Sequence, residues 1–298
     1  MVSVTAKPNL IKVIRISIII PTYNRPDKLA ACLNSISKQS ISTEDFEVIV
    51  VDDGSDRDPG PAIANYHEHL HLHLITQDNS GPASARNTGV AVAQGEFIAF
   101  TDDDCLLHED WLSEILSSLQ SNPDALVGGK TINQLKDNIY SQNSQNLLDH
   151  LYDYHTRNNP ELLFFPTNNM ALTRQGFINA GGFDEGFPSA SGEDREFCDR
   201  WLHHGNTLES NLEAIVYHCH DLNLAGFCEL HYRYGKGARR FWRCRTTRGQ
   251  GYLSIEKLKF YTSLLTHPWK INMPRPLFSS WLLALSQVAN AAGYFSIR

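Results

Sequence analysis

Short apolar runs alternate with amphipathic segments along the first half of the chain. The runs at residues 16–20, 47–51, 72–76 and 96–100 are rich in Ile, Val, Leu and Phe, as expected of parallel strands that are buried on both faces. Segments with the apolar spacing of one helix face lie between them. One begins at Pro26, and the others cover residues 82–92 and 109–119. This succession predicts an α/β fold with a Rossmann-like, doubly wound mixed sheet.

The second half of the chain has a weaker pattern. Residues 128–165 are mixed and polar, which predicts an excursion over the sheet, and residues 164–172 return to the core. A glycine-rich stretch at 181–192 precedes a charged helix at 194–203, and a basic region at 232–251 leads into a helical tail. We therefore expect one α/β domain over residues 1–220 and a basic, helical C-terminal extension over residues 221–298.

Charge is divided unevenly between these two parts. The net charge of -7 combines 14 Lys/Arg against 30 Asp/Glu in residues 1–220 with 12 against 3 in residues 221–298. A basic region on an acidic protein indicates an anionic contact. The contact is nucleic acid, a membrane surface, a lipid phosphate or the acidic part of the same chain.

Cysteine usage and hydropathy bear on the location of the protein. The six cysteines show no C-x-x-C spacing, and the N-terminal residues lack the charged and apolar regions of a signal peptide. Reduced thiols and a cytoplasmic location are therefore expected. The segment at 277–295 is too polar for a membrane span, but its amphipathic character is compatible with contact at a membrane interface.

Polar clusters follow three of the predicted strands. They are T-Y-N at 22–24, D-D-G-S at 52–55 and D-D-D at 102–104. Ligands of a doubly wound sheet bind beyond the carboxyl ends of its strands. Crowded carboxylates repel one another unless they share a cation, and Mg²⁺ and Mn²⁺ prefer oxygen ligands completed by phosphates and water. The acidic triplet therefore indicates a metal that holds a diphosphate, with a solvated acidic turn as the alternative.

Seven short motifs occur in an order that resembles family-2 glycosyltransferases, which are built on the nucleotide-diphosphosugar transferase A-type fold. They are IIIPTYNR at 18–25, VVDDGS at 50–55, NSGPASARNTG at 79–89, FTDDD at 100–104, NNMA at 168–171, GGFDE at 181–185 and GEDREF at 192–197. The resemblance covers about residues 15–220. It implies that this part is the nucleotide-sugar-binding and catalytic domain.

The resemblance also implies a set of donor-binding residues. The nucleoside is expected at Pro21, Thr22, Tyr23 and Arg25, and Asp53 is expected to accept a hydrogen bond from the nucleobase. The alternative for Asp53 is a turn or a helix cap.

A second group is expected to approach the diphosphate. Gly81 lies in a Gly- and Ala-rich loop where backbone approaches a ligand closely, and Arg86 in the helix that follows supplies positive charge. The alternative for Arg86 is an exposed arginine paired with a carboxylate.

A metal site is implied by the acidic triplet and a later histidine. Asp104 is the expected direct ligand of Mn²⁺ or Mg²⁺, and Asp102 is expected at the metal or at the ribose. Asp103 belongs to the same donor-binding triplet, although alternation in an extended chain points its side chain the other way. His218 is the favoured third ligand, and His220, on the same strand face, is its rival.

The Glu193–Asp194 pair carries the expected catalytic chemistry. In inverting members of the family the aspartate of this pair removes the proton of the acceptor hydroxyl, a role that suits a positioned carboxylate. Asp194 is therefore the expected general base, and Glu193 is expected to order the loop or the acceptor. The alternative is a pair of acidic residues favoured by the helix dipole.

These expectations add up to an inverting, metal-assisted glycosyltransferase. Its partners are a nucleoside-diphosphate sugar, UDP-linked by expectation, and a glycan or lipid-linked acceptor of the cell envelope. Peripheral contact with an anionic membrane is expected, and nucleic acid is not. Two alternatives are a nucleotidyltransferase, which usually has a basic Gly-rich loop after its first strand, and a catalytically silent sugar-nucleotide-binding protein.

Overall fold

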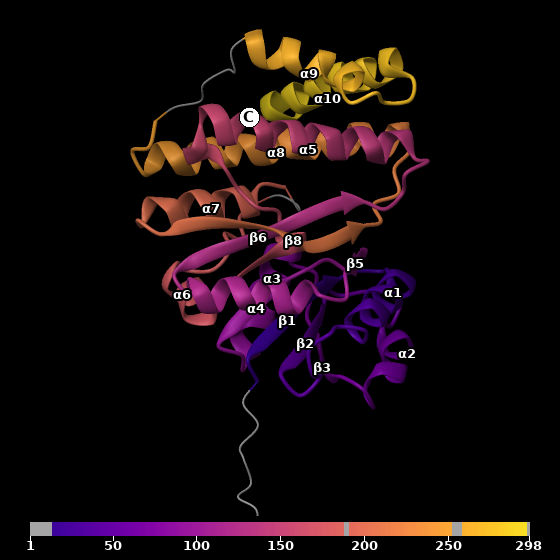
Figure 1. Ribbon diagram of the computed structural model, residues 1–298, viewed down its shortest axis with the longest axis vertical. Coiled ribbons are helices and arrows are strands. Elements are labelled where there is room, and N and C mark those ends of the chain that lie inside the picture. The colour runs from indigo at the N-terminus through magenta and orange to yellow at the C-terminus, as the bar shows by residue number, and fades with distance from the viewer. Residues whose placement is uncertain (1–13, 188–190, 252–257, 297–298) are drawn as a thin grey trace, which may run out of the picture.

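The residues described by the computed structural model, 14–187, 191–251 and 258–296, form an eight-stranded sheet in the order β3-β2-β1-β4-β7-β6-β8-β5 (Figure 1). The strands are β1 (Ile16–Thr22), β2 (Phe46–Asp52), β3 (His71–Thr76), β4 (Phe97–Phe100), β5 (Cys105–Leu107), β6 (Ala125–Asn133), β7 (Met170–Thr173) and β8 (Thr207–His218). Strands β1 to β4 are parallel, whereas β7 is antiparallel to β4 and β6, and β5 is antiparallel to β8. The predicted mixed α/β sheet is confirmed.

Helices cover both faces of this sheet. They are α1 (Pro26–Ile36), α2 (Gly60–Ile63), α3 (Pro82–Val92), α4 (Trp111–Ser121), α5 (Ile139–Asn158), α6 (Arg174–Asn179), α7 (Glu193–His203), α8 (Leu224–Thr247), α9 (Leu258–Lys270) and α10 (Pro276–Ser296), with short 3₁₀ turns at Ala64–Tyr66, Pro160–Leu162 and Thr167–Asn169. Apolar side chains of α1 and α4 pack in one buried cluster, and those of α3, α6 and α7 pack in another. The sheet is therefore doubly wound, as its sequence pattern predicts.

The predicted strands and helices of the first half are confirmed, with ends shifted by one or two residues. Strands β1 and β2 are buried along their whole length because their side chains face a helix layer on each side. On α1, the predicted apolar face is the buried face. The parallel arrangement brings the ends of β1, β2 and β4 to one edge of the sheet.

The predicted excursion over the sheet is wrong for residues 128–133, which belong to β6, a strand inside the sheet. Helix α5 of the same segment does leave the sheet, and it packs against α8, α9 and α10 as well as β6. Two glycines weaken the strand pattern of β6. One of them, Gly128, faces the ring of Phe165, where an added Cβ would lie 1.9 Å from a ring carbon. Close packing, which the apolar pattern does not record, selects glycine here.

A layer of long helices lies beside the sheet at the top of Figure 1. It contains α5, α8, α9 and α10, so the predicted helical C-terminal region is confirmed and is joined by one helix from the middle of the chain. Within the described ranges, no helix is both long enough and apolar enough to traverse a lipid bilayer.

Candidate active site

Strand pairing brings the acidic triplet to a histidine that is far away in the sequence. The triplet lies between β4 and β5, and β5 pairs with the end of β8 so that Cys105 lies opposite His218. The His218 Nε2 consequently lies 3.2 Å from Oδ1 of Asp104. His220 lies beyond the end of β8, with its ring 5.3 Å from the ring of His218. Of the two candidate histidines, His218 is therefore the one that contacts the triplet.

Asp104 is held by cationic groups on the floor of the site. Its Oδ2 lies 3.0 Å from Arg25 Nη1 and 3.5 Å from Lys28 Nζ. Burial by itself would raise the pKa of Asp104, but the hydrogen bond and charge of His218, with Arg25 and Lys28, hold that pKa well below its usual range. Asp104 is consequently a carboxylate at neutral pH, which is the state that binds a metal.

Asp103 is hydrogen-bonded to the end of β1 and shares Arg25 with Asp104. It is fully buried, accepts a hydrogen bond of 2.7 Å from the Thr22 hydroxyl, and pairs with Arg25 at 3.0 Å. Burial raises the pKa of Asp103 to about 7, even though the charge of Arg25 opposes the shift. This carboxyl group therefore connects the acidic triplet to the end of β1.

Asp53 organises the loop that precedes α3. One of its carboxylate oxygens accepts hydrogen bonds from Gln77 Nε2 and the Ser80 amide, and the other accepts from the Gly81 amide. Gly81 has a φ of +89°, a conformation that favours glycine, and it directly precedes α3. These contacts hold the loop at the end of β2, beside the end of β1.

A buried arginine bridges the two acidic motifs. Arg86 is 2% exposed, and its Nη2 lies 2.7 Å from Asp102 Oδ1 while its Nη1 lies 3.1 Å from Glu193 Oε1. The other carboxylate oxygen of Glu193 is buried without a hydrogen-bond partner. Burial raises the pKa of Glu193, and the charge of Arg86 opposes that shift.

Asp194 lies in the first turn of α7, immediately after Glu193. Its Oδ1 accepts a hydrogen bond of 2.7 Å from the Arg195 amide. Burial and the charge of Glu193 raise the pKa of Asp194 to about 7. A carboxyl group with such a pKa takes up a proton readily near neutral pH.

These side chains meet in a cavity of about 520 Å³ between the sheet and the helical layer. Its floor contains six of the residues singled out from the sequence: Arg25, Asp102, Asp104, Arg86, Glu193 and Asp194, with His218 beside them. Thr22, Asp53, Gly81 and Asp103 do not line the cavity. Of these four, Asp103 contacts a lining residue, Arg25. Tyr23 is 45% exposed at the surface, and Pro21 is buried within β1.

The family model described as "Glycosyl transferase family 2" matches residues 17–182. The chain belongs to this family. The glycosyltransferase AglE of Haloferax volcanii is 36% identical over 117 residues, which is 38% of each chain. The matching part of this chain spans about half the length of the two curated relatives that follow in similarity.

Solved structures support the fold of this family 2 member. The mannosyltransferase PcManGT from Pyrobaculum calidifontis, in complex with GDP-Man and Mn²⁺, has a TM-score of 0.62 at 19% identity and covers 93% of this chain and 75% of its own. Staphylococcus aureus TarS 1-349 in complex with UDP has a TM-score of 0.53 at 19% identity, with coverage of 94% and 89%. The predicted glycosyltransferase A-type fold is confirmed, and family membership argues against a nucleotidyltransferase.

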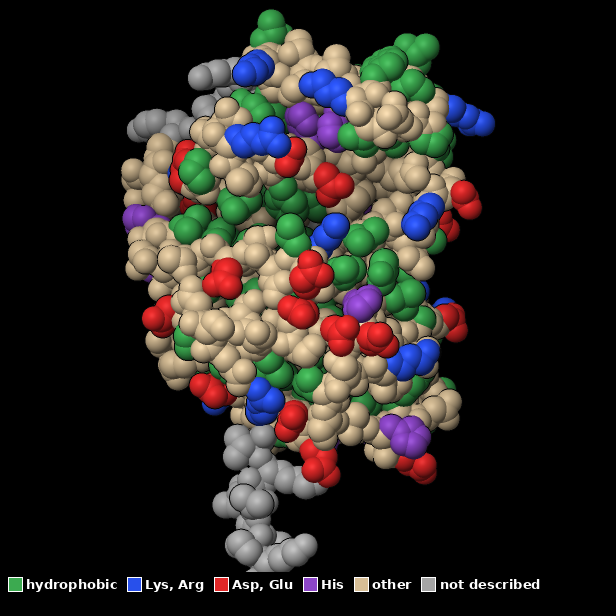
Figure 2. Space-filling view, in the orientation of Figure 1, with side chains coloured by type: hydrophobic (Ala, Val, Ile, Leu, Met, Phe, Trp, Pro, Cys, Tyr) green, Lys and Arg blue, Asp and Glu red, His purple; other side chains and the backbone are tan. Residues whose placement is uncertain are grey.

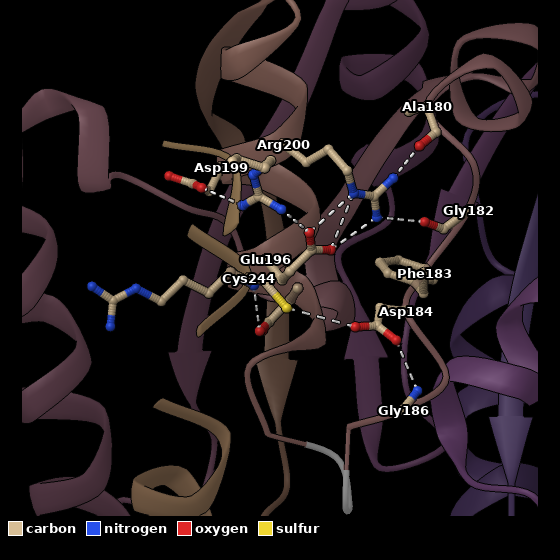
Figure 3. A network of polar contacts seen from close by, with 12 residues as sticks. Ala180, Gly182, Phe183, Asp184, Gly186, Glu196, Asp199, Arg200 and Cys244 are labelled. Atoms are coloured by element: carbon tan, nitrogen blue, oxygen red, sulfur yellow. Dashed lines mark hydrogen bonds and ion pairs between the residues drawn. The ribbon is translucent and has the colours of Figure 1, made fainter. Parts of the chain in front are cut away.

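An ionic network joins this site to the C-terminal helix α8 (Figure 3). Glu196 and Asp199 of α7 are each 3% exposed. Arg248, the residue that caps the C-terminal end of α8, contacts both carboxylates, at 2.6 and 2.5 Å, and Arg245 of α8 contacts Asp199. Arg240 pairs with Asp184 at 2.8 Å in the segment before α7.

The same network explains the uneven charge along the chain. Arg240 and Arg245 of α8, with Arg248 directly after it, face acidic residues of the part of the chain before residue 220. On the face seen in Figure 2, acidic side chains gather over the middle and lower parts of the molecule. Of the anionic contacts considered from the sequence, the acidic part of the same chain is therefore the one found in the structure.

Residues from α5, α8 and α10 line the upper part of the cavity, and the sequence pattern does not assign them to the site. Examples are His155 of α5, Tyr234 and Phe241 of α8, and Asn290 of α10. The signal that the sequence offers is the aromatic and basic stretch that begins at residue 232. Its composition indicates a contact for a lipid phosphate or a membrane, whereas part of it forms a wall of the cavity.

Proposed function

We propose that this family 2 member is an inverting glycosyltransferase. It moves a sugar from a UDP-linked donor to a hydroxyl group of a glycan or lipid-linked acceptor, in the synthesis of a cell-envelope glycan. The observation that carries the proposal is the position of the Glu193–Asp194 pair in one cavity with Asp102 and Asp104. The solved neighbour TarS 1-349, which is in complex with UDP, supports the choice of nucleotide.

Asp104 and His218 are the residues proposed to hold Mn²⁺ or Mg²⁺. Their facing atoms are 3.2 Å apart, close to the ~3 Å between neighbouring ligands of an octahedral ion with bonds near 2.1 Å. The Cys105 thiol is a third possible ligand, with the three ligand atoms within 4.8 Å of one another, but it suits softer metals. When bound, the metal supplies positive charge that stabilises the leaving diphosphate.

The cationic side chains of the floor have separate proposed roles. Arg86 keeps Asp102 and Glu193 in place through its two short contacts. Arg25 is half-exposed and contacts Asp104; near a bound donor its guanidinium also neutralises phosphate oxygens, which a planar fork of donors suits. Asp53 shapes the nucleoside side of the site by holding the Gly81 loop.

Asp194 is the proposed general base. As the acceptor oxygen bonds to the anomeric carbon, the bond from that carbon to the diphosphate breaks and the hydroxyl proton passes to Asp194. Attack from the face opposite the leaving group inverts the anomeric configuration without a covalent intermediate. The raised pKa of Asp194 suits this role because a general base works best when its pKa lies near the working pH.

The experiment compares Asp194→Asn with its neighbour Glu193→Gln. Asp194→Asn keeps the size of the side chain, so we expect UDP affinity with Mn²⁺ to persist while sugar transfer falls by roughly 10²-fold or more. Glu193→Gln weakens the contact with Arg86, so we expect a change in donor affinity as well as in turnover. UDP titration by calorimetry and transfer from a panel of UDP-sugars give both values. Near wild-type transfer by Asp194→Asn would exclude this residue as the base.

The role of the C-terminal region is part of the proposal. We retain residues 1–220 as the catalytic domain and residues 221–298 as a helical extension, and we add that α8 of the extension completes the cavity. Contact with an anionic membrane stays a prediction. Fewer charges are available for it than the sequence implied, because two arginines of α8 and Arg248 directly after it pair with acids. Flotation of the whole protein with anionic liposomes at low salt tests it.

A further inference from the structure

The wall of the cavity includes an arginine that contacts two aromatic rings. Arg195 follows Asp194 in the first turn of α7 and is one of the residues that line the cavity. Its guanidinium carbon lies 4.4 Å from the ring centre of Phe241 of α8 and 5.7 Å from that of Phe164. Cation–π contacts with two rings restrict the orientation of the planar group. They fix its positive charge next to the proposed base in the chain.

Two buried polar atoms of α5 lie in the same region without hydrogen-bond partners. They are Nδ1 of His155, a residue that is 2% exposed and lines the cavity, and the hydroxyl oxygen of Tyr152. The two residues are three positions apart, so they share one helix face, and the Tyr152 ring packs at 5.6 Å against the ring of Phe164. Buried polar groups are nearly always hydrogen-bonded. Unpaired atoms beside a cavity therefore indicate a ligand that completes them.

Arg195 and Tyr152 share a neighbour, since the ring of Phe164 contacts both. Burial, followed by the charge of Arg195, lowers the pKa of His155 to about 4. Burial, followed by the charge of Asp194, raises the pKa of Tyr152 well above its ordinary value. At neutral pH the imidazole is therefore uncharged and the phenol keeps its proton, so both can donate a hydrogen bond.

The positions of the charged side chains in the cavity wall favour one class of ligand. The carboxylates of the described lining residues lie on the floor, in the acidic triplet and the Glu193–Asp194 pair. Besides Arg25 and Arg86 on the floor, the described lining residues that carry a full positive charge are Arg195, which contacts Phe241 of α8, and Arg233 of α8. A guanidinium with two neutral donors fits an oxyanion, and aromatic walls suit the apolar face of a sugar ring.

We propose that Arg195, His155 and Tyr152 form an acceptor subsite for an oxyanion, either a carboxylate or a phosphate, carried by the acceptor sugar. The subsite rests on the proposed glycosyl transfer and names the class of acceptor. An anionic group held at Arg195 places a neighbouring hydroxyl of the same acceptor beside Asp194. Neutral acceptors lack this anchor.

The test uses the whole protein with saturating UDP and Mn²⁺, so that the donor site is occupied. Calorimetric titrations compare methyl glucuronide, which carries a carboxylate, and glucose 6-phosphate with neutral methyl glucoside. We expect at least one anionic ligand to bind about 10-fold or more tightly than the neutral one, as a charge-assisted hydrogen bond implies. The better of the two distinguishes carboxylate from phosphate.

Variants locate the binding. Arg195→Gln is expected to abolish the preference for the anion, whereas the matched control Arg157→Gln, at an arginine of α5 whose side chain is 74% exposed, keeps it. Tyr152→Phe removes only an unpartnered hydroxyl, so we expect weaker anion binding with no fall in Tm, which a purely structural role would not produce.

Equal affinity for anionic and neutral ligands, or an anion preference that survives Arg195→Gln, would overturn the subsite. A failure of the proposed function is separate and is seen as the absence of UDP binding by the wild-type protein. In that case the titrations without UDP still decide the subsite, because loss of anion preference in Arg195→Gln supports it and its retention overturns it.

Discussion

Helix α8 touches the backbone that leads to the proposed base, and Gly237 is the point of contact. An added Cβ at Gly237 would lie 1.8 Å from the carbonyl oxygen of Ser191 and 2.6 Å from its carbonyl carbon. Ser191 is three residues before Asp194 and directly precedes the turn into α7. We therefore predict that Gly237→Ala displaces the start of α7 and lowers turnover.

The magnitude follows from the distance that must be recovered. Contacts of a Cβ below 3.0 Å essentially never occur, so α8 and Ser191 must separate by at least about 1.2 Å, the difference between 3.0 and 1.8 Å. Misplacing a catalytic group by about 1 Å can cost roughly 10²-fold in rate. Overpacking of this kind costs about 1–3 kcal/mol of stability, so the variant is expected to fold with a lower Tm.

Two glycines of the same helix serve as controls. An added Cβ at Gly226 meets nothing closer than 3.5 Å, so Gly226→Ala should keep full turnover and gain a little stability from helix propensity. Gly235 faces the backbone of Asn290 in α10 at 1.9 Å. Gly235→Ala should therefore lose stability as Gly237→Ala does, yet lose much less turnover.

The assay measures kcat for transfer from a UDP-sugar, UDP affinity and Tm for the three variants, well below each melting transition. The reasoning predicts a kcat loss of roughly 10²-fold for Gly237→Ala alone, with UDP affinity retained. It would be refuted by a Gly237→Ala variant that keeps wild-type kcat. It would equally be refuted by the same kcat loss in Gly235→Ala.

Two further predictions concern the proposed base and the metal. Because the pKa of Asp194 is raised from 3.8 to about 7, kcat at pH 6 should be roughly 10-fold below its plateau at high pH; a flat profile from pH 6 to 9 contradicts the assignment. The native state keeps a proton that the unfolded chain releases near pH 4, so the contribution of Asp194 to stability is present below that pH and is lost as pH rises to about 7. Asp104→Ala should remove the dependence of UDP binding on a divalent cation, and calorimetry showing equal UDP affinity with Mn²⁺ and with chelator in the wild-type protein would contradict the metal site.

The doubly wound sheet and the acidic residues on the floor of the cavity follow from the linear pattern of residues. The strands are apolar enough to be recognised one by one, and parallel strands bring their carboxyl ends to one edge. The positions of Asp102 and Asp104 at the end of a predicted strand are therefore sufficient to assign them to the site, and both line the cavity. The family resemblance adds Glu193 and Asp194, which no local pattern would join to the triplet.

The choice between His218 and His220 required the fold, because the register of β5 on β8 selects the histidine that meets Asp104. The fold was also required to identify the helices that line the upper part of the cavity. Helix α5 is polar along much of its length and gives a weak signal, and its buried side is defined by helices more than 60 residues further along the chain. In the sequence the basic stretch that contains Arg245 and Arg248 indicates a surface for an anionic partner, whereas the fold pairs these two arginines with Glu196 and Asp199. Contacts between distant segments depend on how shape and charge meet in space, and a linear pattern does not record this.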